Sequence, residues 1–325
     1  MQKLSQLSLI LTTAFLASHT SNVLASDNYP NRPIKLVVPF TPGGSTDFVA
    51  RLIGEKLTER TGQTLVIENR PGAGGTIGAN YSAKAKPDGY TLFAGHVGTL
   101  SINPGLYKKL SYEPATDFAP ITAMVQAPLV LVVSPQSSVH TVGDLIKEGK
   151  TKQHGLTYST AGAGSAAHLA SELFSSMTGI SATHIPYKGT ADATNAVAAG
   201  DVDFNFSGQK PSQPLIEAKR LRSLGLTSLE RMPGDAGEAL VSETVANYEV
   251  QNWHGIVAPA GTPQPIIDFL NKEVTAILQM PQVRKTLADY GYETIPMTPQ
   301  AFSELIANDR KKWKAVIDRA GLMLE

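Results

Sequence analysis

The chain has 325 residues and contains no cysteine. Disulfides, thiolate catalysis and zinc sites built on thiolates are therefore excluded. An exported protein without cysteine fits a bacterial periplasm when a large core makes disulfides unnecessary. Apolar residues make up 42% of the sequence, which is enough for such a core. The length predicts two domains.

Basic blocks and long apolar runs are also missing. The 28 basic and 28 acidic residues are spread along the chain, so the electrostatic footprint of a nucleic-acid partner is absent. No stretch approaches the roughly 20 apolar residues that a membrane-spanning helix needs. An anionic ligand would have to be held by local geometry, because the protein has no strong overall charge.

Residues 1–25 have the pattern of a secretory signal peptide. Lys3 supplies a positive charge, LSLILTTAFLA is the apolar segment, and VLA at Val23–Ala25 supplies short residues before the cut. We expect cleavage after about Ala25 and release into the periplasm, which leaves 27 basic and 28 acidic residues. The alternative is a short membrane anchor.

Short apolar runs alternate with helical patterns along the chain. The first pair is IKLVVPF at 34–40 and a helix at 48–62, and the alternation is repeated in the second half. This order predicts an α/β protein with parallel sheets flanked by helices.

Two segments are candidates for crossings between domains. The continuous apolar run at Pro128–Pro135 can leave a first sheet, and the segment Asn252–Pro263 can return to it. The sequence therefore predicts a discontinuous first domain of residues 26–127 and 254–325, with residues 128–253 as an inserted second domain. The rival division is two consecutive domains that meet near residue 150. A cleft between two such lobes is a common place for a small ligand.

The turn PFTPGGSTD, at Pro39–Asp47, joins a strand to a helix. Its glycines allow a close backbone approach, and Ser45, Thr46 and Asp47 are candidate N-caps. The first N–H groups of a helix have no intrahelical partner and attract an anion such as a carboxylate. Asp47 opposes an anion by charge, so we expect it to cap the helix or to bind a ligand hydroxyl or ammonium group. The alternative is an ordinary capped turn.

A second turn, YSTAGAGSAAHL at 158–169, has the same design. Gly162 and Gly164 follow a strand, and Ser165 begins a helix. If each lobe contributes one such turn, both can face the same cleft.

Enzyme patterns are weak. Gly162, Gly164 and Ala167 match a dinucleotide fingerprint, but the acidic residue expected about 20 positions later is missing. There is no G-x-S-x-G motif, and Ser165 with His168 lacks a third member of a triad. His96 and His254 appear isolated, without metal-ligand spacing. We expect no catalytic residue, no metal and no cofactor.

Seven segments in order resemble the Bug-type periplasmic solute-binding proteins of tripartite tricarboxylate transporters. The resemblance covers almost the whole exported chain, and its segments are PFTPGGSTD, ENRPGAGGTIGA, KPDGYTL, STAGAGSAAHLASELF, HIPYKGTADA, GDVDF and WHGIVAPAGTP. It implies a two-lobed Venus flytrap of the type II binding-protein class. It also implies that a small carboxylate binds between the lobes and is delivered to a two-subunit membrane permease.

The two turns and the resemblance together predict the ligand-binding residues. Lys188 is the one obvious cation among these loops, and Ser207 and Gln209 belong to a polar segment that departs from the family pattern. The predicted residues are Phe40, Thr41, Gly43, Gly44, Ser45, Thr46, Asp47, His96, Val97, Gly98, Ala161, Gly162, Ala163, Gly164, Ser165, His168, Tyr187, Lys188, Gly189, Ser207 and Gln209.

The predicted function is a periplasmic receptor for a di- or tricarboxylate or an aromatic carboxylate. It is not an enzyme, and a monomer is expected because the lobes must close. The alternative is a ligand-sensing partner of a membrane sensor kinase, without transport. A secreted hydrolase is disfavoured.

Overall fold

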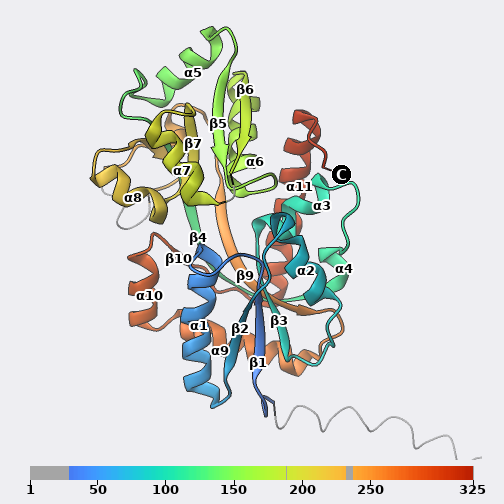
Figure 1. Cartoon of the computed structure of the whole chain (residues 1–325). Helices are drawn as coiled ribbons and strands as arrows, with labels where there is room; N and C mark the ends of the chain where they lie inside the picture. The colour runs from blue at the N-terminus through green and yellow to red at the C-terminus, as the bar shows by residue number, and fades with distance from the viewer. Residues whose placement is uncertain (1–28, 188, 232–236, 325) are drawn as a thin grey trace, which may run out of the picture.

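The computed structural model describes residues 29–187, 189–231 and 237–324. They form two α/β lobes joined by two long strands, β4 (Phe118–Val133) and β9 (Gln251–Pro259), which pair with each other (Figure 1). The predicted two-lobed α/β fold is confirmed. The predicted signal peptide lies outside the described residues.

The first lobe is built on three parallel strands in the order β2-β1-β3, with β9 antiparallel to β3. The central strand β1 has the sequence IKLVV and is buried along most of its length, as expected for a parallel strand covered on both faces. The elements of this lobe are β1 (Ile34–Val38), α1 (Ser45–Thr61), β2 (Leu65–Asn69), η1 (Ala73–Gly75), α2 (Thr76–Ala83), β3 (Thr91–His96), η2 (Gly98–Ile102), α3 (Asn103–Leu106), α4 (Pro114–Asp117), α9 (Gln264–Leu278), α10 (Pro281–Ala288), β10 (Glu293–Thr294) and α11 (Pro299–Ala320).

The second lobe has β5 between β6 and β7, and all three strands run parallel. The far half of β4 closes this sheet by pairing antiparallel with β7 and β8. The elements are α5 (Val142–Thr151), β5 (Leu156–Thr160), α6 (Ala166–Thr178), β6 (Ala182–Pro186), α7 (Thr190–Ala199), β7 (Phe204–Gly208), α8 (Gln209–Glu217), β8 (Arg222–Leu226) and η3 (Val241–Glu243).

Each lobe has the predicted parallel strands, and β4 and β9 add antiparallel pairs to them. The chain crosses between the lobes once in each direction, so these two strands are antiparallel to each other. The partner of β4 changes within the strand: Pro128 pairs with β9, and Leu129 pairs with β7. This change coincides with the predicted first crossing. The division into domains of residues 26–127 with 254–325 and 128–253 stays a prediction.

The C-terminal helix α11 packs on both lobes. It contacts η2, α3 and β4, and it also contacts α6 in the second lobe. Trp253 is buried on β9, and its indole Nε1 donates to Asp309 of α11 over 2.6 Å. A buried hydrogen bond thus connects the crossing strand β9 to helix α11.

Two helices of the second lobe were not predicted. α5 begins with a capping box in which the Thr141 hydroxyl and the Asp144 carboxylate satisfy each other's backbone N–H groups. That T-x-x-D spacing was a usable signal. α8 covers the polar segment after β7 and contains Pro214, and neither property favours a helix prediction.

Candidate functional site

The strand ends of the two lobes face each other across a narrow interface. A Cβ atom placed on Gly98, after β3, would lie 3.2 Å from the carbonyl oxygen of Gly164, after β5. A Cβ on Gly74 in η1 would lie 3.5 Å from the carbonyl oxygen of Ala163. In open α/β sheets, ligands bind at the carboxyl ends of strands. The candidate site therefore lies where these ends meet.

A second contact between the lobes involves Gln209 at the start of α8. A Cβ atom on Gly291, which precedes β10, would lie 2.0 Å from the Gln209 Oε1 atom. The φ of +75° favours glycine at position 291, whereas the Gln209 amide is the end of a flexible side chain that can shift. Gln209 thus reaches the interface between the lobes, where we find it against backbone. Its predicted contact with ligand stays a prediction.

The first turn leaves the start of α1 open. The N-cap is Gly44, with extended φ and ψ of −76° and 172°, and none of the described side chains caps the helix. The prediction that Ser45, Thr46 or Asp47 is the N-cap was wrong, because these residues form the first helical turn. The 17-residue helix therefore presents its first N–H groups, with the positive end of its dipole, at the mouth of the turn.

The Asp47 side chain holds this turn in place through hydrogen bonds. Its buried carboxylate accepts hydrogen bonds from the Gly43 N–H (2.8 Å), the Asn69 amide (2.8 Å) and the Arg51 Nε (2.8 Å). Burial favours the neutral form, but these hydrogen bonds hold the pKa of Asp47 below its usual value. Both carboxylate oxygens have partners, which belong to the turn (Gly43), to α1 (Arg51) and to β2 (Asn69), so Asp47 positions the backbone. We find no support for its predicted bond to a ligand hydroxyl or ammonium group.

Replacing Asp47 by alanine should lower the free energy of unfolding by about 3 kcal/mol, because hydrogen bonds to a charged group are each worth roughly 1.5–3 kcal/mol. Asp47→Asn keeps the shape and one acceptor oxygen, which can hold the bonds from Gly43 and Arg51 but not the one from Asn69, so we expect about half that loss. Urea unfolding at pH 7 measures both. A loss for Asp47→Ala within the range of ordinary surface substitutions, about 0.5 kcal/mol, would show that Asp47 does not organise the turn.

Beneath the turn lies a cluster of aromatic and polar side chains. His96 and His254 are opposite each other on β3 and β9, with ring centroids 6.3 Å apart. Phe40 packs on His96 at 4.9 Å between centroids, and the Thr46 hydroxyl lies 3.2 Å from His254 Nδ1. The expectation that the two histidines are isolated was wrong, because β3 and β9 are distant in sequence but adjacent in the sheet.

The remaining predicted residues of the first lobe surround this cluster. Thr41, Gly43 and Ser45 are exposed on the turn. Val97 and Gly98 are buried, and the Gly98 N–H donates to His96 Nδ1 over 2.9 Å.

The second turn differs from the first, because its own side chains satisfy its donors. The Gly162 N–H donates to the Thr160 hydroxyl (3.0 Å), and the Gly164 N–H donates to His168 Nδ1 (3.2 Å). Ser165 caps α6: its hydroxyl accepts from the His168 N–H (3.3 Å) and donates to the Gly162 carbonyl (2.7 Å). The two turns therefore share their strand-to-helix position but differ in how many of their donors are already bonded. Two carbonyl oxygens of this turn, those of Ala163 and Gly164, lie beside Gly74 and Gly98 of the first lobe.

A buried polar layer supports the second turn. The His168 ring stacks on His184 at 4.2 Å between centroids, and His184 Nε2 lies 2.6 Å from the Thr160 hydroxyl. Tyr158 donates to Glu172, whose carboxylate lies 3.9 Å from His168 Nε2. Burial, helped by the neighbouring His184, lowers the pKa of His168 to about 3. His168 is therefore neutral at pH 7, and its Nδ1 can accept the Gly164 N–H.

Two other helices of the second lobe begin at glycines. Gly189 and Gly208 are the N-caps of α7 and α8, and in the described chain neither helix has a side-chain cap. Tyr187 and Ala161 are half-buried beside the second turn, while Lys188 lies outside the described residues. Ser207 is buried and shares a 2.8 Å hydrogen bond with Thr194, so its hydroxyl faces the inside of the lobe. The prediction that Ser207 reaches the cleft is not supported.

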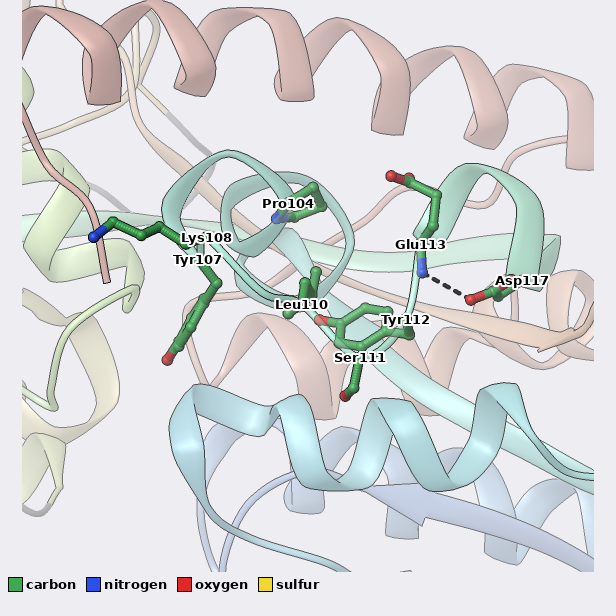
Figure 2. Close-up of a pocket in the computed structure, with 8 residues that line it drawn as sticks. All are labelled: Pro104, Tyr107, Lys108, Leu110, Ser111, Tyr112, Glu113 and Asp117. Atoms are coloured by element: carbon green, nitrogen blue, oxygen red, sulfur yellow. Dashed lines mark hydrogen bonds between the residues drawn. The ribbon is translucent and has the colours of Figure 1, made fainter. Parts of the chain in front are cut away.

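A separate surface pocket of about 410 Å³ lies along α3, α4 and the segment that joins them. Glu113 and Asp117 line it, and the Glu113 N–H donates to the Asp117 carboxylate over 2.8 Å, as Figure 2 shows. Arg310 pairs with Glu113, and none of the predicted ligand-binding residues lines this pocket. Its lining residues are Pro104, Tyr107, Lys108, Leu110, Ser111, Tyr112, Glu113 and Asp117.

Within the described residues, no group of three or more His, Cys, Asp or Glu side chains is placed to hold a metal ion. Among their helices, none combines the length and apolar character that crossing a membrane requires.

Solved structures similar to this chain come from carboxylate-binding and periplasmic proteins. Rpa4515 of R. palustris, solved with adipate, is 37% identical, with a TM-score of 0.85 over 91% of this chain and 100% of that one. The periplasmic binding protein BugD is 34% identical, with a TM-score of 0.82 over 91% and 100%. MatC from Rhodopseudomonas palustris, with bound malate, is 31% identical, with a TM-score of 0.81 over 89% and 100%.

A family model describes the same relationship from the sequence. The model of the tripartite tricarboxylate transporter family receptor matches residues 49–322, which include the second turn, both crossing strands and most of α1. Together with the two-lobed fold, this match confirms the resemblance drawn from the seven segments. The chain belongs to the tripartite tricarboxylate transporter receptor family and is a Bug-type solute-binding protein.

Proposed function

We propose that this protein is a periplasmic receptor that captures a small carboxylate between its lobes, a di- or tricarboxylate or an aromatic carboxylate. The observation that carries the proposal is the uncapped start of α1 at Gly44, on the strand-end side of the first lobe. Adipate and malate in the related structures support a carboxylate as the ligand.

One carboxylate of the ligand binds the backbone N–H groups at Gly43–Asp47. Charge-assisted hydrogen bonds to a helix start are stronger than neutral ones, and the helix dipole adds to them. The negative charge of Asp47 does not oppose the ligand strongly, because Arg51 neutralises it over 2.8 Å. Several such bonds support micromolar binding, roughly −8 kcal/mol.

The other end of the ligand meets the second lobe. The starts of α7 and α8 at Gly189 and Gly208, which no described side chain caps, offer backbone donors there. A ligand that contacts both lobes binds the closed arrangement more tightly than an open one. It therefore shifts the population toward the closed arrangement. The closed form then delivers its ligand to a two-subunit membrane permease.

A thermal-shift screen of residues 26–325 tests this proposal. Mono-, di- and tricarboxylates and aromatic acids are compared with their uncharged amides. A carboxylate at 100 times its dissociation constant should add about 2.7 kcal/mol of stability, and the matched amide should add almost none. Stabilisation by amides as strong as by acids, or by no acid at all in protein shown to be ligand-free, would contradict carboxylate recognition.

A further inference from the structure

His96 and His254 form a buried pair with unused hydrogen-bonding capacity. Their exposed fractions are 6% and 2%, and each Nε2 atom is buried without a hydrogen-bond partner among the residues that the structure describes. Buried polar atoms in folded proteins almost always have a partner, because an unpaired one costs free energy. Two such atoms on directly opposed residues point to a polar group that binds both.

The hydrogen bond that each ring makes at Nδ1 determines whether its Nε2 is a donor or an acceptor. His96 Nδ1 accepts the Gly98 N–H, so the neutral ring carries its proton on Nε2. His254 Nδ1 faces the Thr46 hydroxyl at 3.2 Å, and when it accepts that hydroxyl its proton also lies on Nε2. The pair then presents two N–H donors, which suit an anion.

The pair lies at the boundary between the lobes. The Cε1 atom of His96, which is bonded to Nε2, would be 2.3 Å from a Cβ on Gly98, and Gly98 borders Gly164 of the second lobe. On the first-lobe side, Phe40 and Thr46 of the open turn pack on the two rings. The two rings therefore lie beside the turn and the first residues of α1.

We propose that His96 and His254 form the floor of the carboxylate site and donate hydrogen bonds from Nε2 to the carboxylate that the α1 turn holds. This inference rests on the proposed function. Both rings are neutral, so the site can bind an anion without a cationic side chain. The titratable groups packed on the pair are the two rings themselves and Tyr292, which lies 5.9 Å from His254 between centroids.

Two substitutions of His96 separate this role from a structural one. Asparagine places an acceptor near the position of Nδ1 and keeps the Gly98 bond, but it has no group at Nε2. Glutamine places an amide donor near Nε2 and loses the Gly98 bond. In the ligand-free protein we expect His96→Asn to be the more stable variant.

The affinities should rank in the opposite order. By calorimetry with the carboxylate from the screen, His96→Asn should bind at least about tenfold more weakly than wild type, because a hydrogen bond to a charged group is lost. His96→Gln should stay within about threefold of wild type, since it keeps the donor. His254→Asn and His254→Gln should follow the same order.

The outcomes separate the two proposals. Affinities that rank in the same order as the stabilities would overturn the role of the pair and leave the carboxylate site intact. Equal affinities for both variants would also overturn it. Failure of wild type to bind any carboxylate would instead overturn the proposed function.

Discussion

Replacing Gly44 by aspartate should abolish carboxylate binding while the protein stays folded. The backbone φ of −76° suits any residue, and a Cβ at this position meets only the Thr41 carbonyl oxygen, at an ordinary 3.6 Å. Aspartate is a good N-cap, so its carboxylate would accept from the N–H groups that the ligand uses. The new side chain thus competes with the ligand for the same N–H groups. As a better N-cap than glycine, it should raise the free energy of unfolding by a few tenths of a kcal/mol.

Calorimetry with Gly44→Asp and Gly44→Ala distinguishes competition from crowding. Alanine adds the Cβ without an acceptor, so its affinity should stay within a few-fold of wild type. Aspartate should weaken binding by about 100-fold or more, the equivalent of two charge-assisted hydrogen bonds. Wild-type affinity in Gly44→Asp would show that the ligand does not use this turn.

Mild acid should destabilise the protein strongly between pH 6.5 and 4. Burial lowers the pKa of His96 to about 3, with help from His254, and burial lowers the pKa of His254 to about 4. The pKa of His168 is also about 3, through burial and His184. Below the unfolded pKa of about 6.5 the unfolded chain binds these protons and the folded protein does not. Stability is therefore complete above pH 6.5 and falls as the pH approaches the folded pKa values.

The expected size of the effect is large. At pH 5 each of these three histidines lowers the free energy of unfolding by about 2 kcal/mol. The sum approaches the whole free energy of unfolding of a typical protein. Asp309 acts in the opposite direction, because burial raises its pKa despite the bond from Trp253. Carboxylates with lowered pKa values, such as Asp47, add to the loss of stability only at lower pH.

Denaturant unfolding at pH 7.5 and pH 5 measures this effect. His168→Asn keeps an acceptor for the Gly164 N–H and should reduce the pH dependence by about 1.4 kcal/mol per pH unit, the contribution of one proton. Equal stability at the two pH values would contradict the burial of neutral histidines.

The sequence predicted the elements whose signals are local. The apolar run of β1 followed by glycines and a helical pattern located the open turn at Gly43–Asp47, and the matching pattern near Gly162 located its counterpart. The difference between the turns was not predictable, because the donors of the second are satisfied by side chains on β5 and α6. Such bonds depend on rotamers and packing.

Pairings across the sheet could not be predicted from the sequence either. His96 and His254 became neighbours only through the antiparallel register of β3 and β9, which no local pattern determines. The same is true of Gln209 against Gly291, where two lobes meet. By contrast, the capping box of α5 was readable in the sequence.

A crystal structure with the carboxylate from the screen would test the central claim most directly. We expect a carboxylate of the ligand within hydrogen-bonding distance, roughly 2.7–3.2 Å, of backbone nitrogens at Gly43–Asp47. The lobes should enclose it, with the Ala163 turn on the opposite side. A ligand bound elsewhere, such as in the pocket beside Glu113 and Asp117, or one held with no contact to the start of α1, would contradict the account.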